Sequence, residues 1–258
     1  MNILKPEYGD VLWGNCTKSP EAGLESVSSD EDRELIKAFY RDGYVVLKNA
    51  NSEVVCDKAI EAYEKWVSSR ASDKEGIRED SKNPRVVNLH SEVNEIKDLV
   101  TKNSKILDFV DKLFGFETSI YTSLSFQFGT EQPLHRDTPV FRTAPEEFYF
   151  GVWCALEDAD HSNGCLKALS GGHLLGNIDQ YHFAKKWIDA GGEITPGAKG
   201  IWPLFQNAVT KSCIDDGAKE VFIHANKGDI VIWHPQLPHG GSPIRNIDKT
   251  RYSVVYHV

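Results

Sequence analysis

Cationic side chains are outnumbered in this sequence. Its 258 residues include 29 lysines and arginines against 38 aspartates and glutamates, which gives a formal net charge of -9. Binding to nucleic acid or to an anionic membrane needs a basic surface, so neither partner is expected. No stretch approaches the roughly 18 consecutive apolar residues that a membrane-spanning helix needs. The composition is therefore that of an ordinary globular protein.

The cysteines also exclude a class of fold. There are five of them, an odd number, and they are scattered without a C-x-x-C pair. A disulfide framework is therefore not expected, and a reducing compartment fits better. The first residues, MNILKPEYGDVLWGN, show no basic region followed by an apolar run. We accordingly predict no signal peptide and a cytoplasmic location.

Helical periodicity dominates the first part of the chain, from about 30 to 115. The run SSDEDRELIKAFYRDG predicts a helix that Ser or Asp caps and Gly43 ends. Helical spacing of apolar residues returns over 52–71 and over 91–114. Between the first two of these helices, the run YVVLKNA predicts a short β-branched strand.

The character of the chain changes from about residue 118 onward. Six strand-like runs follow one another between turn residues, namely SIYTSLSFQFG, FYFGVWCAL, GCLKAL, EVFIHA, DIVIWH and RYSVVYHV. Many short strands of this kind are typical of a barrel or sandwich. An insertion over about 179–218 carries a possible helix and the apolar run IWPLF, and it predicts a lid or covering element. We expect an α+β, mainly β fold in a single domain over 1–258.

The run PLHRDTP places His135 and Asp137 two residues apart. In an extended strand such residues point to the same face, so an imidazole nitrogen and a carboxylate oxygen can reach one metal ion. Non-haem Fe(II) oxygenases use two histidines and one carboxylate on one face of the metal. By itself H-x-D is a weak signal, and a solvated loop is the alternative.

The third ligand has to come from elsewhere in the chain. His239 lies in the glycine-rich run QLPHGGSP, with His234 as its rival. Twelve residues further on, Arg251 opens the last strand-like run and could clamp a dicarboxylate by paired hydrogen bonds. Ser253 shares its face and could add a hydroxyl donor, while Arg245 is the rival arginine.

These motifs together resemble the phytanoyl-CoA dioxygenase-like family of Fe(II)/2-oxoglutarate oxygenases. The resemblance covers about 35–49 and 120–258. It rests on GYVVLKN, HRD, GVWCALEDADHSNGCLKALSGGH, GDIVIWHPQLPHGGSP and RYS. The block ALEDADHSNGCL with the later GGH is its most specific part, although Gly172 stands where the family usually has Ser.

The resemblance implies roles for single residues. His135, Asp137 and His239 match the family's iron ligands, and Arg251 matches the arginine that binds the far carboxylate of 2-oxoglutarate. Trp153 matches a tryptophan beside this cosubstrate, and Ser253 is a helper there. The implied fold is a double-stranded β-helix, a cupin-like jelly-roll barrel with N-terminal helices packed on one sheet.

The function that the resemblance implies is an Fe(II)- and 2-oxoglutarate-dependent dioxygenase that also consumes O2. Related halogenases carry a small residue at the position of Asp137, so hydroxylation of a C–H bond or a related oxidation is favoured, with release of succinate and CO2; desaturation and ring formation stay open. A small metabolite, natural-product intermediate or sugar-type substrate is preferred. The sequence sets neither the substrate nor the oligomeric state.

Two other functions stay open at this point. One is a cupin-like metal enzyme that does not use 2-oxoglutarate, in which Arg251 would have no obvious role. The other is a non-catalytic jelly-roll binding protein, against which the intact His135, Asp137 and His239 argue. A set of basic residues near the expected cleft is best interpreted as solvated surface charge, namely Arg78, Arg85, Arg142 and Lys167.

Overall fold

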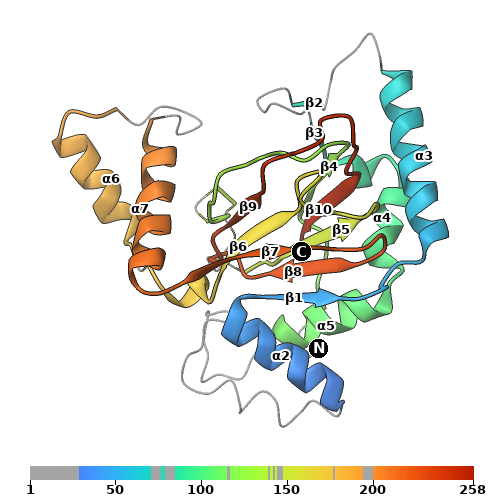
Figure 1. The fold of residues 1–258 in the computed structure, drawn as a ribbon, viewed down its shortest axis with the longest axis horizontal. Coiled ribbons are helices and arrows are strands. Elements are labelled where there is room, and N and C mark those ends of the chain that lie inside the picture. The colour runs from blue at the N-terminus through green and yellow to red at the C-terminus, as the bar shows by residue number, and fades with distance from the viewer. Residues whose placement is uncertain are drawn as a thin grey trace.

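Two antiparallel sheets form the body of the protein (Figure 1). The computed structural model describes residues 29–70, 77–78, 85–114, 117–138, 140–141, 143, 148–176, 178–193 and 200–258. The large sheet has the strand order β1-β8-β5-β10-β4-β3-β2. Its strands are β1 (Tyr44–Leu47), β2 (Ile77–Arg78), β3 (Arg85–Val87), β4 (Thr122–Phe126), β5 (Gly151–Ala155), β8 (Ile230–Trp233) and β10 (Ser253–His257).

The small sheet faces the large one and has the order β7-β6-β9. It consists of β6 (Leu166–Ser170), β7 (Lys219–Ile223) and β9 (His239–Gly241). One apolar layer fills the space between the sheets and includes Trp153, Val231 and Trp233 from the large sheet and Leu166 and Ile223 from the small one. This arrangement confirms the predicted fold class, a mainly β, jelly-roll architecture.

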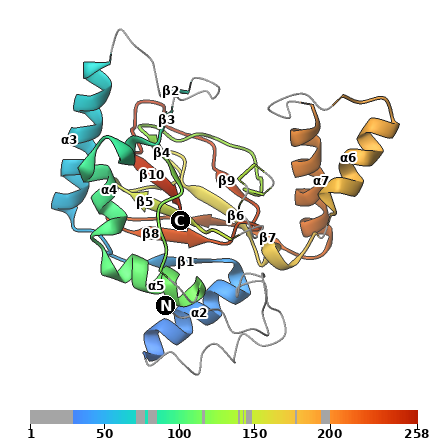
Figure 2. The ribbon, with the colours of Figure 1, turned by 180° about the vertical axis from the view of Figure 1, so that it is seen from behind.

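Alternation along the central strands separates two cores. On β5, Trp153 points between the sheets, whereas Val152 and Cys154 belong to the core on the outer face of the large sheet. Four helices cover that outer face, and Figure 2 shows α3 and α4 at the left of the strands and α5 and α2 below them. They are α2 (Asp30–Asp42), α3 (Glu53–Ser69), α4 (Asn94–Thr101) and α5 (Ser104–Phe114), with the 3-10 turn η3 (Leu89–Ser91) before α4.

The ends of α2 confirm the predicted caps. The hydroxyl of Ser29 accepts a hydrogen bond from the backbone N–H of Asp32 at 3.3 Å. At the other end Gly43 has φ +80°, and its N–H donates to the carbonyl of Phe39. Only glycine adopts this left-handed conformation at little cost, so the helix ends there.

The pattern over 91–114 forms two helices instead of one. The break falls at Asn103, whose side-chain amide donates to the carbonyl of Ala50. Its own carbonyl accepts from Ile106 and Leu107, which starts α5 in a new direction. A hydrogen bond from a side chain to a backbone group elsewhere in the chain competes with continuation of the helix. The spacing of apolar residues does not reveal such a bond.

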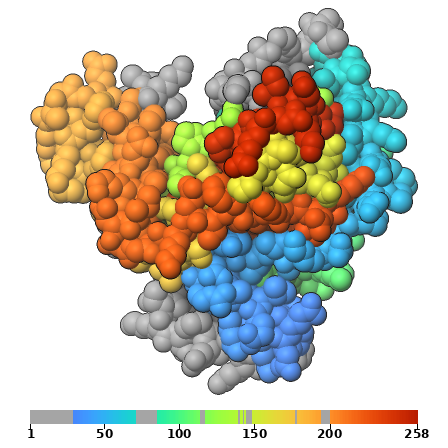
Figure 3. All heavy atoms as spheres, in the orientation of Figure 1, coloured from blue at the N-terminus to red at the C-terminus, as the bar shows by residue number. Residues whose placement is uncertain are grey.

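The insertion forms a helical pair, α6 (Gln180–Asp189) and α7 (Ile201–Asp215), after the 3-10 turn η4 (Gly172–Leu174). The run IWPLF, for which the sequence pattern predicts no particular secondary structure, forms the start of α7. Figure 3 shows the two helices as a lobe at the side of the barrel. Their role as a lid and the single-domain organisation of 1–258 stay predictions. Among the described residues, no helix is long and apolar enough to cross a membrane.

Candidate metal centre and cosubstrate pocket

Backbone pairing brings the two candidate histidine ligands together. His135 and His239 form an antiparallel bridge in which each backbone N–H donates to the other's carbonyl at 2.9 Å. Their imidazole centroids are 4.6 Å apart. Gly240 permits this approach, because a Cβ there would collide with the backbone carbonyls of Gln132 and Pro133. The glycine after His239 is therefore a steric requirement of the site.

Contacts of the imidazole rings with backbone carbonyls determine which ring nitrogen of each histidine faces the site. Nδ1 of His135 lies 2.9 Å from the carbonyl of Pro133, and Nδ1 of His239 lies 2.9 Å from that of Leu237. A carbonyl only accepts, so each Nδ1 carries the proton and each Nε2 presents a lone pair. The side-chain amide of Gln132 donates to Nε2 of His135 at 3.0 Å.

Asp137 completes the cluster with one oxygen and is held by the other. Its Oδ1 lies 4.0 Å from Nε2 of His135 and 3.8 Å from Nε2 of His239. Its Oδ2 accepts a hydrogen bond from the indole of Trp233 at 2.8 Å, and Nε2 of His257 lies 3.4 Å away. The nitrogen and oxygen atoms of His135, Asp137 and His239 that could bind a metal all lie within 4.8 Å of one another.

Burial and neighbouring groups set the charges in this cluster. Burial lowers the pKa of His135 to about 4, so its imidazole is neutral near pH 7. Burial alone would raise the pKa of Asp137, but the imidazoles of His239 and His257 outweigh it and the pKa is lowered. The result is a carboxylate at Asp137 and a neutral imidazole at His135, the charge states in which these groups ligate a divalent metal.

A cavity of about 360 Å³ opens over this cluster and extends to Arg251. The guanidinium of Arg251 is 2% exposed, and one of its nitrogens donates to the carbonyl of Gly164. Burial lowers its pKa to about 10, so it remains a cation at neutral pH. Its Nε has no hydrogen-bond partner, and no carboxylate of the described residues pairs with it. A buried cation in this state fits a ligand that carries a carboxylate.

Trp153 and Ser253 lie on the same side of the large sheet as Arg251. Trp153 lines the cavity, and the guanidinium of Arg251 lies 5.6 Å from the centroid of its ring. The hydroxyl of Ser253 is buried and makes no hydrogen bond within the described part of the chain. The structure thus brings all six predicted site residues to one region, and their roles stay predictions.

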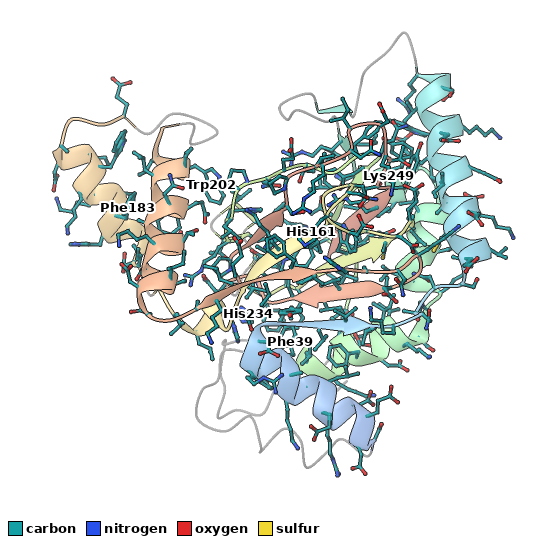
Figure 4. All side chains as sticks on the ribbon, viewed as in Figure 1. Phe39, His161, Phe183, Trp202, His234 and Lys249 are labelled. Carbon is teal, nitrogen blue, oxygen red and sulfur yellow. The ribbon has the colours of Figure 1, made fainter. Side chains whose placement is uncertain are left out.

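The two rival residues lie elsewhere. His234 is buried against Phe39 and Phe150, with ring centroids 6.2 Å away in each case, on the helix-covered side of the sheet (Figure 4). Arg245 is exposed in the loop after β9. Neither residue lines the cavity.

Sequence reasoning missed several residues of the site. Trp233 and His257 contact Asp137, and Gln132 contacts His135, as described above. Arg85 lines the cavity, which corrects its interpretation as surface charge. His257 could have been found, because it lies at i+6 from Arg251 on the same strand face. Trp233 could not, because its contact with Asp137 depends on how the two sheets pack against each other.

The sheets and the cluster define the class of this protein. It is a double-stranded β-helix protein with two imidazoles and one carboxylate at a deep pocket, the ligand set of non-haem iron oxygenases. A model of the family described as phytanoyl-CoA dioxygenase matches residues 39–252. The chain therefore belongs to the phytanoyl-CoA dioxygenase family, which confirms the resemblance.

Individual relatives are distant. The chain is 27% identical over 163 residues to a phytanoyl-CoA dioxygenase domain-containing protein 1 homolog of Caenorhabditis briggsae, a match to 62% of this chain and 52% of that protein. The chain thus spans about half the length of this relative. Phytanoyl-CoA dioxygenase domain-containing protein 1 of Danio rerio is 26% identical over 268 residues, a match to 99% and 83% of the two chains.

A solved structure shows the same fold. The crystal structure of EctD from S. alaskensis with 2-oxoglutarate and 5-hydroxyectoine superposes with a TM-score of 0.63 at 17% identity. The superposition covers 98% of this chain and 80% of EctD. At 17% identity this similarity establishes the fold alone.

Proposed function

We propose that this protein is an Fe(II)- and 2-oxoglutarate-dependent dioxygenase that hydroxylates a C–H bond of a small organic substrate and releases succinate and CO2. In this proposal His135, Asp137 and His239 are the iron ligands, and Arg251 binds 2-oxoglutarate. One observation carries it: the His135, Asp137 and His239 cluster and a buried arginine without a carboxylate partner line the same cavity.

The donor set fits iron. Two imidazole nitrogens and one carboxylate oxygen are the ligands of non-haem Fe(II) oxygenases, whereas structural zinc sites commonly include thiolates. Each candidate ligand is oriented by a second contact, from Pro133, Leu237 or Trp233. When bound, iron supplies the activation of O2 and of the C–H bond, coupled to oxidative decarboxylation of 2-oxoglutarate.

The chain's own residues would position the cosubstrate. Arg251 offers its unpartnered Nε and its charge to the far carboxylate, and Trp153 forms an apolar wall beside it. Ser253 is the proposed additional donor, since its buried hydroxyl lacks a partner. The low dielectric around Arg251 strengthens its attraction to a carboxylate.

The remaining walls of the cavity favour a substrate with both apolar and polar parts. Phe141 and Trp202 contribute aromatic surface, while Arg85, Thr122 and Thr130 contribute polar groups. Trp202 points from the first turn of α7 toward the barrel (Figure 4). A small metabolite, natural-product intermediate or sugar derivative has this mixed character.

The test is anaerobic binding of Fe(II) and 2-oxoglutarate, followed by succinate release in air. Chelation of the iron by 2-oxoglutarate would give a visible metal-to-ligand charge-transfer band. We expect this band in the wild type and in the control Asp248→Ala, whose carboxylate is exposed. Asp137→Ala should lose both the band and succinate release.

The possible outcomes separate the alternatives. Iron binding without the band would exclude 2-oxoglutarate and favour a cupin-like metal enzyme. Absence of iron binding would favour a binding protein. Full turnover by Asp137→Ala would overturn the ligand assignment.

A further inference from the structure

A second cluster of metal-binding side chains lies outside the cavity. His161, Cys165 and His224 each offer one ligand atom, and these atoms all lie within 4.8 Å of one another. None of the three residues lines the cavity that contains His135, Asp137 and His239. Cys165 is buried, His161 is half-buried and His224 is exposed, so the cluster opens to solvent on the imidazole side.

The backbone fixes this cluster. Strands β6 and β7 pair with Leu166 opposite Ile223, so the next pair outward along the same register is Cys165 opposite His224. Directly opposed side chains on an antiparallel pair are close neighbours. Ala159 then bridges Ala225, which brings the turn containing His161 beside His224. The two imidazoles lie 4.8 Å apart, perpendicular to each other.

We propose that His161, Cys165 and His224 form a second metal site, specific for a borderline-soft divalent ion, Zn²⁺. Two imidazoles and one thiolate are ligands that zinc prefers, and hard ions such as Mg²⁺ bind them poorly. Within the described residues both imidazoles make ring contacts but no hydrogen bond, so each has a nitrogen available. The exposed side leaves a fourth tetrahedral position for water.

Two groups prepare the sulfur for this role. The hydroxyl of Ser242 lies 3.5 Å from Sγ of Cys165 and can donate to a thiolate. Arg251 adds a favourable charge. Burial nevertheless raises the pKa of the Cys165 thiol, so the metal has to displace a proton. Zinc affinity should therefore increase with pH.

The site would join two parts of the barrel. Bound zinc would tie the turn at 160–165 to the end of β7. This turn includes Gly164, whose carbonyl accepts the hydrogen bond from Arg251. The second metal would thus stabilise the backbone that holds Arg251. The metal site itself rests on none of the assignments made under the proposed function.

Titration of metal-free protein with Co²⁺ tests the site, because cobalt substitutes for zinc and reports its ligands. A cobalt–thiolate bond gives an intense near-ultraviolet band that two imidazoles and a carboxylate do not give. We expect this band in the wild type and its loss on addition of Zn²⁺. The band should persist in Asp137→Ala, since it does not depend on the first cluster.

Matched variants assign the ligands. Cys165→Ser should abolish the band, while Cys56→Ser, which alters another buried thiol, should retain it. Because Cys165 is buried and its variant could fail to fold, His161→Ala and His224→Ala provide the second test at more exposed positions, and each should weaken cobalt binding. The proposal is overturned if the wild type shows no band or if the band survives Cys165→Ser. It is also overturned if neither His161→Ala nor His224→Ala weakens cobalt binding.

Discussion

The indole of Trp233 donates a hydrogen bond to Oδ2 of Asp137 over 2.8 Å. This contact turns the other carboxylate oxygen, Oδ1, toward His135 and His239. Trp233 is the last residue of β8 in the large sheet. Asp137 lies two residues after His135, which bridges to His239 on β9 of the small sheet. The hydrogen bond therefore links the two sheets. The orientation of the candidate metal ligand therefore depends on how the two sheets are packed.

Trp233→Phe should weaken Fe(II) binding while leaving the ligands in place. Phenylalanine retains an aromatic ring between the sheets but removes the donor to Oδ2. Loss of such an outer contact typically costs about 10- to 100-fold in metal affinity. Anaerobic Fe(II) titration measures the change. The control is Trp187→Phe on the outer helix α6, which removes an indole donor to the carbonyl of Glu193. Equal affinity of both variants would contradict the orienting role.

Gly151→Ala should disturb Asp137 indirectly, by displacing Trp233. Gly151 is paired with Trp233 across β5 and β8, and a Cβ at this position would collide with the indole ring. The displaced indole could no longer hold Oδ2, so both stability and iron affinity should fall. We expect a loss of about 1–3 kcal/mol in the free energy of unfolding, the usual cost of overpacking. Urea denaturation of metal-free protein measures it, and an unchanged midpoint would contradict the prediction.

Arg251→Lys should raise the KM for 2-oxoglutarate. Lysine keeps the charge but loses the planar fork that binds a carboxylate through two hydrogen bonds. Loss of a charge-assisted hydrogen bond costs about 1.5–3 kcal/mol, which corresponds to about 10- to 100-fold in affinity. Succinate release at varied 2-oxoglutarate measures it. Arg245→Lys, at an exposed arginine outside the cavity, should behave as the wild type.

Acid should destabilise the fold through His173. Burial lowers the pKa of this residue to about 4, although its hydrogen bond to the carbonyl of Tyr40 opposes the shift. The unfolded chain, with a histidine pKa of about 6.5, therefore binds a proton that the folded chain excludes. Stability is full above about pH 6.5 and decreases as the pH falls toward about 4.

The expected loss attributable to His173 is about 2 kcal/mol between about pH 7.5 and about pH 5. His173→Gln retains a donor for Tyr40 but does not titrate, so its unfolding free energy should depend less on pH. Urea midpoints at the two pH values give the comparison, with the exposed His182→Gln as control. The same slope in both variants would show that His173 is not the titrating group.

Local patterns predicted most of the elements because they depend on neighbouring residues. Ser29 and Gly43 set the ends of α2 through backbone bonds within one helical turn. Short runs of β-branched and aromatic residues between turn residues identified β5, β8 and β10. By contrast, the sequence indicated only a glycine-rich run where β9 (His239–Gly241) forms. Three residues are too few to show a strand pattern, and the strand that they pair with, β6, is distant in sequence.

The sequence by itself determined the chemistry that this chain can offer. The H-x-D spacing placed an imidazole and a carboxylate on one strand face, and the family motifs indicated His239 and Arg251 as their partners. Only the tertiary structure decided how these groups are used. Burial made His135 neutral and left Arg251 without a carboxylate, sheet packing brought Trp233 to Asp137, and the β6–β7 register placed Cys165 opposite His224. These properties arise from residues far apart in the chain, which no local pattern connects.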